Sequence, residues 1–441
     1  MKKILLAVIA LLSGVTIHAQ HVWSYDECVE YAVSHNIDIQ QRAVDIELQA
    51  NQLNTIKNDW LPRVSVNGAQ RFSFGNAMAS TGTMATSARQ NHDLSYTNAV
   101  VELDMPVFDG FKRINQQRAA EWSVKQATAQ LASSRKSLSF TLATYYLQAL
   151  YEKGMMEVAE NQVSTSRQMR DKTKAFVDDG RNPQSDLANA EAQLADDEFN
   201  LTKARGRYQI ALLNLSQLLN LESVEGFQIA DITDESVLSQ EFCNPFSLYS
   251  DVVDNYPSIV AEKAKVEKSR YDIAVARAGY YPRIDFRATL NSYYLNLFHV
   301  SHDEGLFKQM WNNKSEVIGL HFNIPVFDHF QTRNNIRKAK MTFTQSNLAL
   351  DDAKQKLRKE INQAYYNALD ARDKFVSAKK SQSASQLSCN FEQEKYEAGR
   401  STSFDLAQAT QRLRKASEDA VQAKYEYIIR MKILNIYSAD E

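Results

Sequence analysis

The chain has 441 residues, of which 44% are hydrophobic and 24% charged, and its 51 basic and 53 acidic residues give a formal net charge of −2. This balance gives no support for a nucleic-acid surface or a polybasic membrane tether. The three cysteines, Cys28, Cys243 and Cys389, have neither metal-ligand nor CxxC spacing, so no cofactor site is expected from them. A disulfide between Cys28 and Cys243 stays open as an alternative in an exported chain.

Residues 1–19 have the layout of a secretory signal peptide. Lys2 and Lys3 are followed by an apolar run from Ile4 to Leu12, and Ala19 precedes Gln20, so we expect cleavage after Ala19. No later stretch approaches the roughly 20 apolar residues that a membrane-spanning helix needs. Any membrane span must therefore be built from strands.

A pair of strands is expected at about 63–76 and 96–107. In the first, Val64, Val66, Phe72 and Phe74 alternate with polar residues, and the second alternates in the same way up to Met105. Period-two alternation is typical of a strand with one apolar face. A transmembrane strand and a half-buried strand of a soluble sheet both give this pattern.

Very long helices follow the strands. Between Gly110 and Gly180 the sequence contains no proline and only one glycine, Gly154. This predicts a helix over about 110–178, a turn at Gly180-Arg181 and a return helix over about 185–220. A helix of this length would extend about 100 Å. We expect residues 227–245 to connect the two halves of the chain, as an equatorial segment beside the middle of the long helices.

The second half repeats the first. Pro62-Arg63 returns as Pro282-Arg283, Pro106-Val107-Phe108-Asp109 as Pro325-Val326-Phe327-Asp328, and Gly180-Arg181 as Gly399-Arg400, at offsets of 219 or 220 residues. We therefore expect two structural repeats, 20–226 and 246–441. The second contains strands at about 283–298 and 315–326, a long helix at about 329–397 and a return helix at about 403–437.

The predicted helices have apolar residues at period seven, which is coiled-coil patterning with alternating large and small residues. The two return helices carry Leu187, Leu194, Leu201, Tyr208 and Leu215, with Ala190, Ala204, Ala211 and Leu218, and then Leu406, Leu413, Ala420, Tyr427 and Leu434, with Ala409, Ala416, Ala423 and Tyr437. The long helices have matching positions at Val124, Leu131 and Leu138 and at Phe343, Leu350 and Leu357. We expect these residues to pack between helices.

The four strands of one chain cannot close a barrel. In lipid an open sheet edge would leave backbone groups unpaired, so a membrane interpretation requires several copies to share one barrel. The polar segments Ala79 to Asp93 and Ser301 to Asn313 would then be loops facing the outside.

Taken together, these features resemble the TolC-like outer-membrane efflux protein family (outer membrane factors). The resemblance is carried by the opening helix from Cys28 to Asn36, the Pro-Arg strand starts, the Pro-Val-Phe-Asp strand ends and the Gly-Arg turns followed by Asp-Leu. It covers nearly all of the chain after residue 19. It implies an α+β fold in which a trimeric 12-stranded transmembrane β-barrel is continued by a long α-helical coiled-coil periplasmic tunnel.

The resemblance also implies a function. The chain would be the outer-membrane channel-tunnel of a tripartite efflux or type I secretion system in a Gram-negative bacterium, and would passively conduct substrates. Its partners would be two further copies (a homotrimer), a periplasmic adaptor (membrane fusion protein), indirectly an inner-membrane pump of RND or ABC type, and outer-membrane lipid. Nucleic acid is not expected as a partner, nor is a cofactor or a metal.

The family's motifs assign roles to residues near the two turns. Gly180, Arg181, Gly399 and Arg400 would be the adaptor-contact tips, and Asp186, Asp405 and Tyr396 would form the periplasmic aperture. Structural alternatives stay open: turn formation for the glycines, charge compensation at a helix end for the arginines, and a first-turn position for the aspartates, with Ser185 and Ser403 as candidate caps. The chain departs from the family pattern at Gln408 and Ser401.

Two other classes of function compete. The sequence has no Gly-rich phosphate loop, HExxH or GxSxG motif, and the neighbouring His299 and His302 have no repeated partner, so we do not expect an enzyme. The remaining alternative is a secreted coiled-coil scaffold or adhesin without a channel. It explains the heptads but not the two strand pairs.

Overall fold

The computed structural model describes residues 22–77, 90–91, 93–221, 223–224, 226–231, 242, 244–298 and 305–438. The predicted signal peptide, most of the segment from Ala79 to Asp93, Cys243, His299 and His302 lie outside this range. The described residues form two compact units, one from within 1–44, 128–260 and 352–441 and one from within 45–127 and 261–351. Both sequence repeats contribute to each unit.

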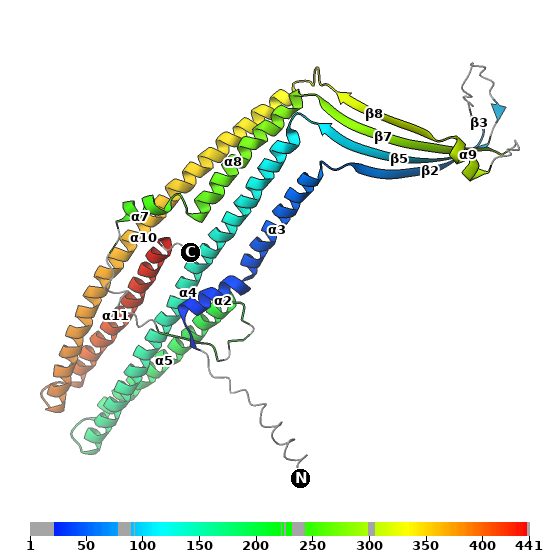
Figure 1. Ribbon diagram of the computed structural model, residues 1–441. Coiled ribbons are helices and arrows are strands. Elements are labelled where there is room, and N and C mark those ends of the chain that lie inside the picture. Colours follow the sequence, from blue (N-terminus) through cyan, green and yellow to red (C-terminus); the bar gives the residue numbers. More distant parts are fainter. Residues whose placement is uncertain are drawn as a thin grey trace, which may run out of the picture. The chain divides into compact units, whose positions relative to one another are not determined.

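The second unit contains a four-stranded antiparallel sheet. Its strands are β2 (Arg63–Ser73), β5 (Leu94–Phe108), β7 (Arg283–Leu297) and β8 (Ser315–Asn323), in the order β2-β5-β7-β8 (Figure 1). Arg63 lies opposite Asp104 in the first repeat, and the equivalent Arg283 lies opposite Asn323 in the second. The duplication therefore preserves the strand register as well as the order of elements. The two-residue strands β3 (Asn76–Ala77) and β4 (Gln90–Asn91) pair separately.

The aliphatic residues of the two outer strands, β2 and β8, are strongly exposed, whereas most of those on β5 and β7 are half-buried. Val66 on β2 keeps 73% of its surface and Ile318 on β8 also keeps 73%, and all nine residues of β8 are exposed. β2 and β8 are the two edges of the sheet. An exposed apolar face beside two unpaired edges needs another apolar or strand-bearing partner.

An aspartate caps the start of each long helix. Asp109 Oδ2 accepts a hydrogen bond from the Arg113 N–H at 3.2 Å, and Asp328 Oδ2 accepts one from the Thr332 N–H at 2.7 Å. Hydrogen bonds from Thr332 lower the pKa of Asp328, since they favour the carboxylate. The repeated Pro-Val-Phe-Asp motif therefore ends the strand segment and fixes the start of α4 (Lys112–Asp178) and α10 (Gln331–Glu397).

The segment between β7 and β8 contains a short helix, α9 (Leu306–Asn312), where the sequence indicated only a polar loop. Seven residues are too few to show a helical period. The helix covers the part of β7 that extends beyond β8, where the Gln309 side chain accepts a hydrogen bond from the Leu295 N–H at 2.6 Å and the Asn313 amide donates to the Tyr293 carbonyl at 3.1 Å. These side chains satisfy backbone groups that have no partner strand there.

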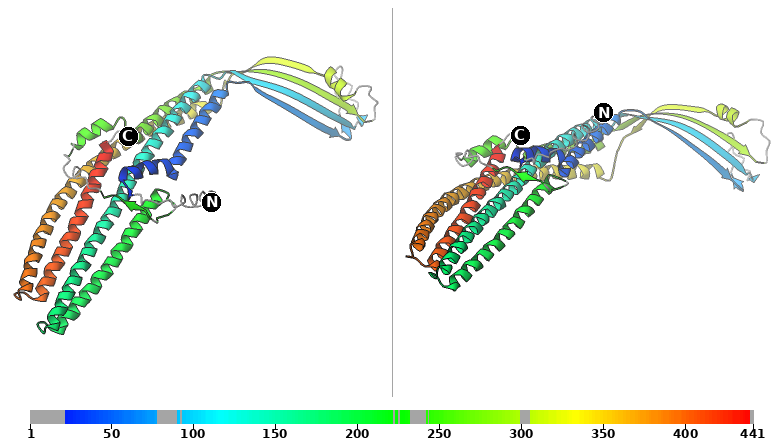
Figure 2. Two further views of the ribbon diagram at one scale, coloured as in Figure 1. Left: turned by 60° about the horizontal axis from the view of Figure 1, so that its bottom comes forward. Right: turned by 90° about the horizontal axis from the view of Figure 1, so that it is seen from below.

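The first unit is built from two helical hairpins. In one, α4 returns as α5 (Gln184–Leu218), and in the other α10 returns as α11 (Ser403–Ser438), as both views of Figure 2 show. α4 and α10 have 67 residues each. The residues expected to pack at period seven are buried or half-buried throughout. α4 continues through Gly154 without a break. A Cβ at this position would lie 2.9 Å from Val421 Cγ1 and 3.0 Å from Tyr425 Cε2 of α11. This glycine allows α4 and α11 to approach closely.

The main hydrophobic core of this unit lies around the middle of α4. Tyr146 is fully buried, and its single hydroxyl proton is shared between the carbonyls of Ala230 (2.7 Å) and Trp23 (3.0 Å). These carbonyls flank the parallel pair β1 (Val22–Trp23) and β6 (Gln228–Ile229). The remaining helices are α2 (Tyr25–His35), α3 (Ile37–Asn58), α7 (Pro245–Val252), α8 (Pro257–Arg277) and the 3-10 helix η1 (Ala278–Tyr280).

Cys28 belongs to the same core as a free thiol. Burial raises the pKa of this thiol to about 12, so it stays protonated and unreactive at neutral pH.

None of the helices in the described ranges is long and apolar enough to cross a membrane.

Candidate functional site at the hairpin turns

The two hairpins reverse direction through the same backbone motif. Gly180 and Gly399 have φ angles of +71° and +69°. The Arg181 N–H donates to the Phe176 carbonyl and the Arg400 N–H to the Lys395 carbonyl, both at 2.8 Å. Together with bonds from Gly180 to Val177 and from Gly399 to Tyr396, this is the Schellman pattern, in which a left-handed glycine ends a helix.

The arginines that follow the glycines differ in their surroundings. The Arg181 guanidinium lies 4.5 Å from the centre of the Phe176 ring, within reach of a cation–π interaction. Arg400 is exposed, and its side chain makes no hydrogen bond or ion pair with the residues that the structure describes. Both arginines stand at helix C-termini, so charge compensation stays compatible with their positions.

Two polar contacts join one hairpin to the other at the turns. Lys172 Nζ lies 2.6 Å from Glu397 Oε1, and the Asn182 amide donates to the Tyr396 hydroxyl at 3.4 Å. The hydrogen bond from Lys172, followed by one from Gln393, lowers the pKa of Glu397. These contacts join the end of α4 and its turn to the end of α10, where the rings of Phe176 and Tyr396 also lie 6.5 Å apart.

The predicted aperture residues occupy two different environments. Asp186 accepts a hydrogen bond at 3.2 Å from the same Asn182 amide that reaches Tyr396, so Asp186 and Tyr396 are brought together across the hairpins. Asp405 is exposed, accepts a hydrogen bond from the Thr402 hydroxyl at 2.6 Å, and donates its own N–H to that hydroxyl at 3.2 Å. Thr402 thus caps α11.

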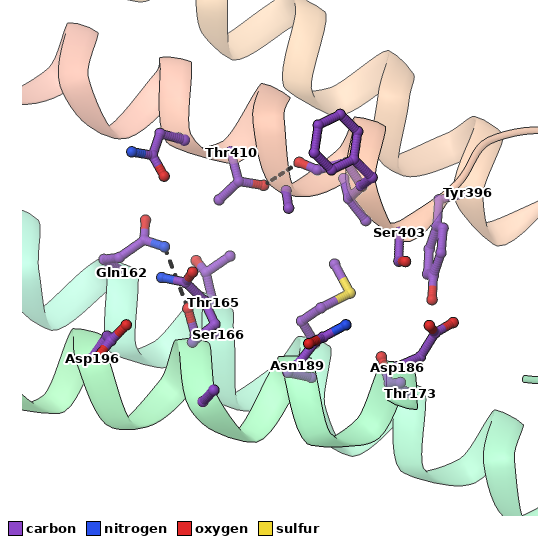
Figure 3. A pocket seen from close by; sticks show the side chains of 18 of the residues that line it. Gln162, Thr165, Ser166, Thr173, Asp186, Asn189, Asp196, Tyr396, Ser403 and Thr410 are labelled. Atoms are coloured by element: carbon purple, nitrogen blue, oxygen red, sulfur yellow. Dashed lines mark hydrogen bonds between the residues drawn. The ribbon is translucent and has the colours of Figure 1, made fainter. Parts of the chain in front are cut away.

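A pocket of about 410 Å³ lies between the hairpins immediately beside these contacts. Asp186 and Tyr396 face each other at one end of it, and Ser403 and Thr410 of one hairpin lie across from Asn189 and Thr165 of the other (Figure 3). Phe404 and Met169 add apolar surface. Asp405 does not line this pocket. The hairpins are therefore incompletely packed against each other near their turns, where a rearrangement of helices needs the least disruption.

The two serines expected as helix caps do not cap their helices. Ser185 lies inside α5, which begins after Pro183 without a side-chain cap, and Thr402 rather than Ser403 caps α11. Other residues of this site were missed by sequence reasoning. Asn182, Lys172 and Glu397 have no repeat or motif that marks them. Glu392 accepts hydrogen bonds from Ser401 and Lys395, and these lower the pKa of Glu392.

A buried carboxylate also interrupts the packing of α4 against α5. Asp197 is 2% exposed and accepts hydrogen bonds from Ser166 (2.5 Å), Gln162 (3.3 Å) and Gln193 (3.2 Å), while its Oδ1 has no hydrogen-bond partner. It occupies the heptad position between Ala190 and Ala204, where the second repeat has Ala416. A missing member of the alanine series was the one available signal for it.

Comparison with known proteins agrees with this arrangement. The family described as "Outer membrane efflux protein" matches residues 29–221 and 248–435. The chain is 21% identical over 429 residues to the outer membrane efflux protein BepC of Brucella suis, covering 97% of this chain and 88% of that protein. It is 21% identical over 446 residues to the outer membrane protein TolC of Escherichia coli, covering 100% of this chain and 86% of that protein.

The fold is shared with solved structures as well. The CmeC outer membrane channel of Campylobacter jejuni superposes with a TM-score of 0.78 at 16% identity, covering 94% of this chain and 85% of that one. Since the family match spans both repeats, the chain belongs to the outer membrane efflux protein family. It is an outer-membrane efflux protein and not an enzyme.

Proposed function

We propose that three copies of this chain form the channel-tunnel of a tripartite efflux or type I secretion system, in which it conducts substrates passively. The observation that carries the proposal is the four-stranded sheet with an exposed aliphatic face and two unpaired edges. In lipid such a sheet is tolerable only as a sector of a closed barrel, because every backbone group must be paired. Three sectors of four strands would give 12 strands.

The helical hairpins supply the second part of the proposal. α4 and α10, with 67 residues each, are about 100 Å long at 1.5 Å per residue, which suits a crossing of the periplasm. Similarity to the alkaline protease secretion protein AprF of Pseudomonas aeruginosa and to the outer membrane efflux protein BepC supports both secretion and efflux as uses of the conduit. The substrate would be selected by the inner-membrane pump, of RND or ABC type.

The hairpin turns would be the end at which a periplasmic adaptor docks. Arg400 is exposed and carries no side-chain partner within the described chain, so its five donors are available to an adaptor. Gly180, Arg181 and Gly399 form the rest of this tip surface. Asp186, Tyr396 and Asp405 would line or close the mouth, which is shut at rest and opened when partner contact shifts the packing of the hairpins.

Planar-bilayer recording of the detergent-extracted protein tests this function. A passive conduit should insert as a discrete unit with a stable conductance that needs no nucleotide or cofactor. A protein that remains soluble after export and never produces conductance steps would instead be the secreted scaffold or adhesin.

A further inference from the structure

The duplication predicts how two copies of the chain join, an inference that rests on the proposed assembly. Within the sheet of one chain the two repeats meet once, where β5 of the first pairs with β7 of the second and Asp104 lies opposite Arg287. In a closed ring the repeats must meet a second time, where β8 of one copy reaches β2 of the next. These two strands are the free edges of the sheet.

The register of this second joint can be read from the first. β5 corresponds to β8 at an offset of 219 residues and β7 to β2 at an offset of 220, and the pairings inside each repeat obey these offsets. Asp104 is therefore equivalent to Asn323, and Arg287 to Asn67. We propose that β8 of one copy pairs antiparallel with β2 of the next copy, with Asn323 opposite Asn67.

The side chains fit this register. The pair Asp104–Arg287 forms an ion pair at 2.8 Å, and both of its equivalents are neutral amides, so neither joint is left with a single charge. Phe322 would lie opposite Gly68 of the next copy, and Gly319 opposite Arg71. A large side chain beside a strand glycine covers backbone that the glycine leaves bare.

The exposed aliphatic residues also agree with it. Ile318 would lie opposite Phe72 of the next copy, and both are strongly exposed in the single chain, at 73% and 59%. A slip by one residue would turn one strand over and place its aliphatic side chains on the polar face. A slip by two residues would leave every side chain on the same face of the sheet. Only the offsets between the repeats distinguish that slipped register from the proposed one.

The proposed joint between copies cannot match the joint within a chain at the turn that follows the strands. A Cβ on Gly110 would lie 2.6 Å from Tyr281 Cβ, so this turn needs glycine where the repeats meet within a chain. The equivalent of Gly110 is His329, and the equivalent of Tyr281 is Leu61. Two such side chains cannot approach so closely, so the joint between copies must be wider here than the joint within a chain.

Pairs of cysteines test the register in the full-length protein in membranes. We expect oxidation to join copies in Asn323→Cys/Asn67→Cys or in Phe322→Cys/Gly68→Cys, giving covalent dimers and trimers on a denaturing gel. Adjacent cross-strand pairs alternate between two geometries, so at least one of the two should close. Inside a single chain these positions are three strand spacings of about 4.8 Å apart, too far for a disulfide.

The controls are Asn323→Cys/Ser65→Cys and Asn323→Cys/Ala69→Cys, which match registers slipped by two residues in either direction, together with the oxidised parent protein. Cross-linking of a slipped pair, but of neither proposed pair, would overturn the register while leaving the assembly intact. The same holds if no pair cross-links although the variants still assemble as trimers. A parent protein that is monomeric in lipid would overturn both the register and the proposed function.

Discussion

At the scale of single residues, the ion pair between Lys172 and Glu397 is the most direct link between the two hairpins. We predict that Glu397→Gln raises the resting conductance in planar bilayers, because the amide keeps the shape but loses the charge attraction across the hairpins. The effect should be modest, up to about fivefold in the ratio of open to closed states, since exposed pairs are weak. Asp171→Asn is the matched control, because Asp171 pairs with Arg170 on its own helix.

The same pair predicts a dependence on pH. The pKa of Glu397 is lowered from 4.5 by its bond to Lys172. A carboxyl with a lowered folded pKa contributes stability above its ordinary value and loses it as the pH falls through the folded value. Closure of the mouth should therefore be unaffected between pH 6 and 8 in the parent channel and weaken only as the pH falls below the ordinary carboxyl pKa of 4.5. Glu397→Gln should remove this part of the acid response, and an unchanged response would show that other groups hold the mouth shut.

Asp405 gives a prediction about selectivity. It is exposed and not neutralised by a cation within the described chain, and three copies near an axis would attract cations, at about 1 kcal/mol for each pair of unit charges 4 Å apart in water. Asp405→Asn should lower the preference for cations and the block by multivalent cations, measured from reversal potentials. Asp419→Asn, about four turns further along α11, is the control. An unchanged preference in Asp405→Asn would remove Asp405 from the mouth.

Only those residues of the site that belong to a local sequence pattern could be predicted. The left-handed glycines were predictable, since a Gly-Arg pair between two long helical patterns requires a tight reversal. Asn182 was not, because its bond to Tyr396 depends on how two separate hairpins pack. The predicted cap positions, Ser185 and Ser403, were wrong by two positions and by one, because Pro183 and Thr402 occupy the N-cap positions of α5 and α11.

At the scale of elements, glycine plays opposite roles in two helices of the first hairpin. A Cβ at Gly154 of α4 would touch Val421 and Tyr425, whereas a Cβ at Gly206 of α5 would meet nothing within 4 Å. We predict that Gly206→Ala stabilises the protein by about 0.5–1 kcal/mol through helix propensity. Gly154→Ala should instead destabilise it by about 1–3 kcal/mol through overpacking.

Thermal unfolding followed by circular dichroism compares these two variants with the same chemical change. Equal stabilisation by both would show that α11 does not depend on the close approach to α4. Loss of the folded state in Gly206→Ala would contradict the open surroundings of that residue.

The long helices were predictable because heptads and the scarcity of glycine and proline are local signals. α9 was not, since its seven residues owe their helical state to the bonds that Gln309 and Asn313 make to β7. The burial of Asp197 was not predictable either, because it too depends on contacts with neighbouring residues. A charged residue in a heptad series favours exposure, yet the hydroxyl and amide donors of three neighbours hold it in the interior.

At the scale of the whole molecule, the duplication was visible in the sequence, but the two compact units were not. The repeats are consecutive halves of the chain, whereas each unit combines segments of both halves, because β5 pairs with β7 and α4 packs against α11. Such contacts between repeats leave no local pattern. The formal net charge of −2 gave no support for nucleic-acid binding, and it was the resemblance to the efflux family that predicted transport.

An electron-microscopy image of the detergent-extracted particle tests the central claim most directly. The account predicts three copies around an axis, with a lumen that runs through both strands and helices. A single copy without a lumen, its sheet edges left unpaired, would contradict it.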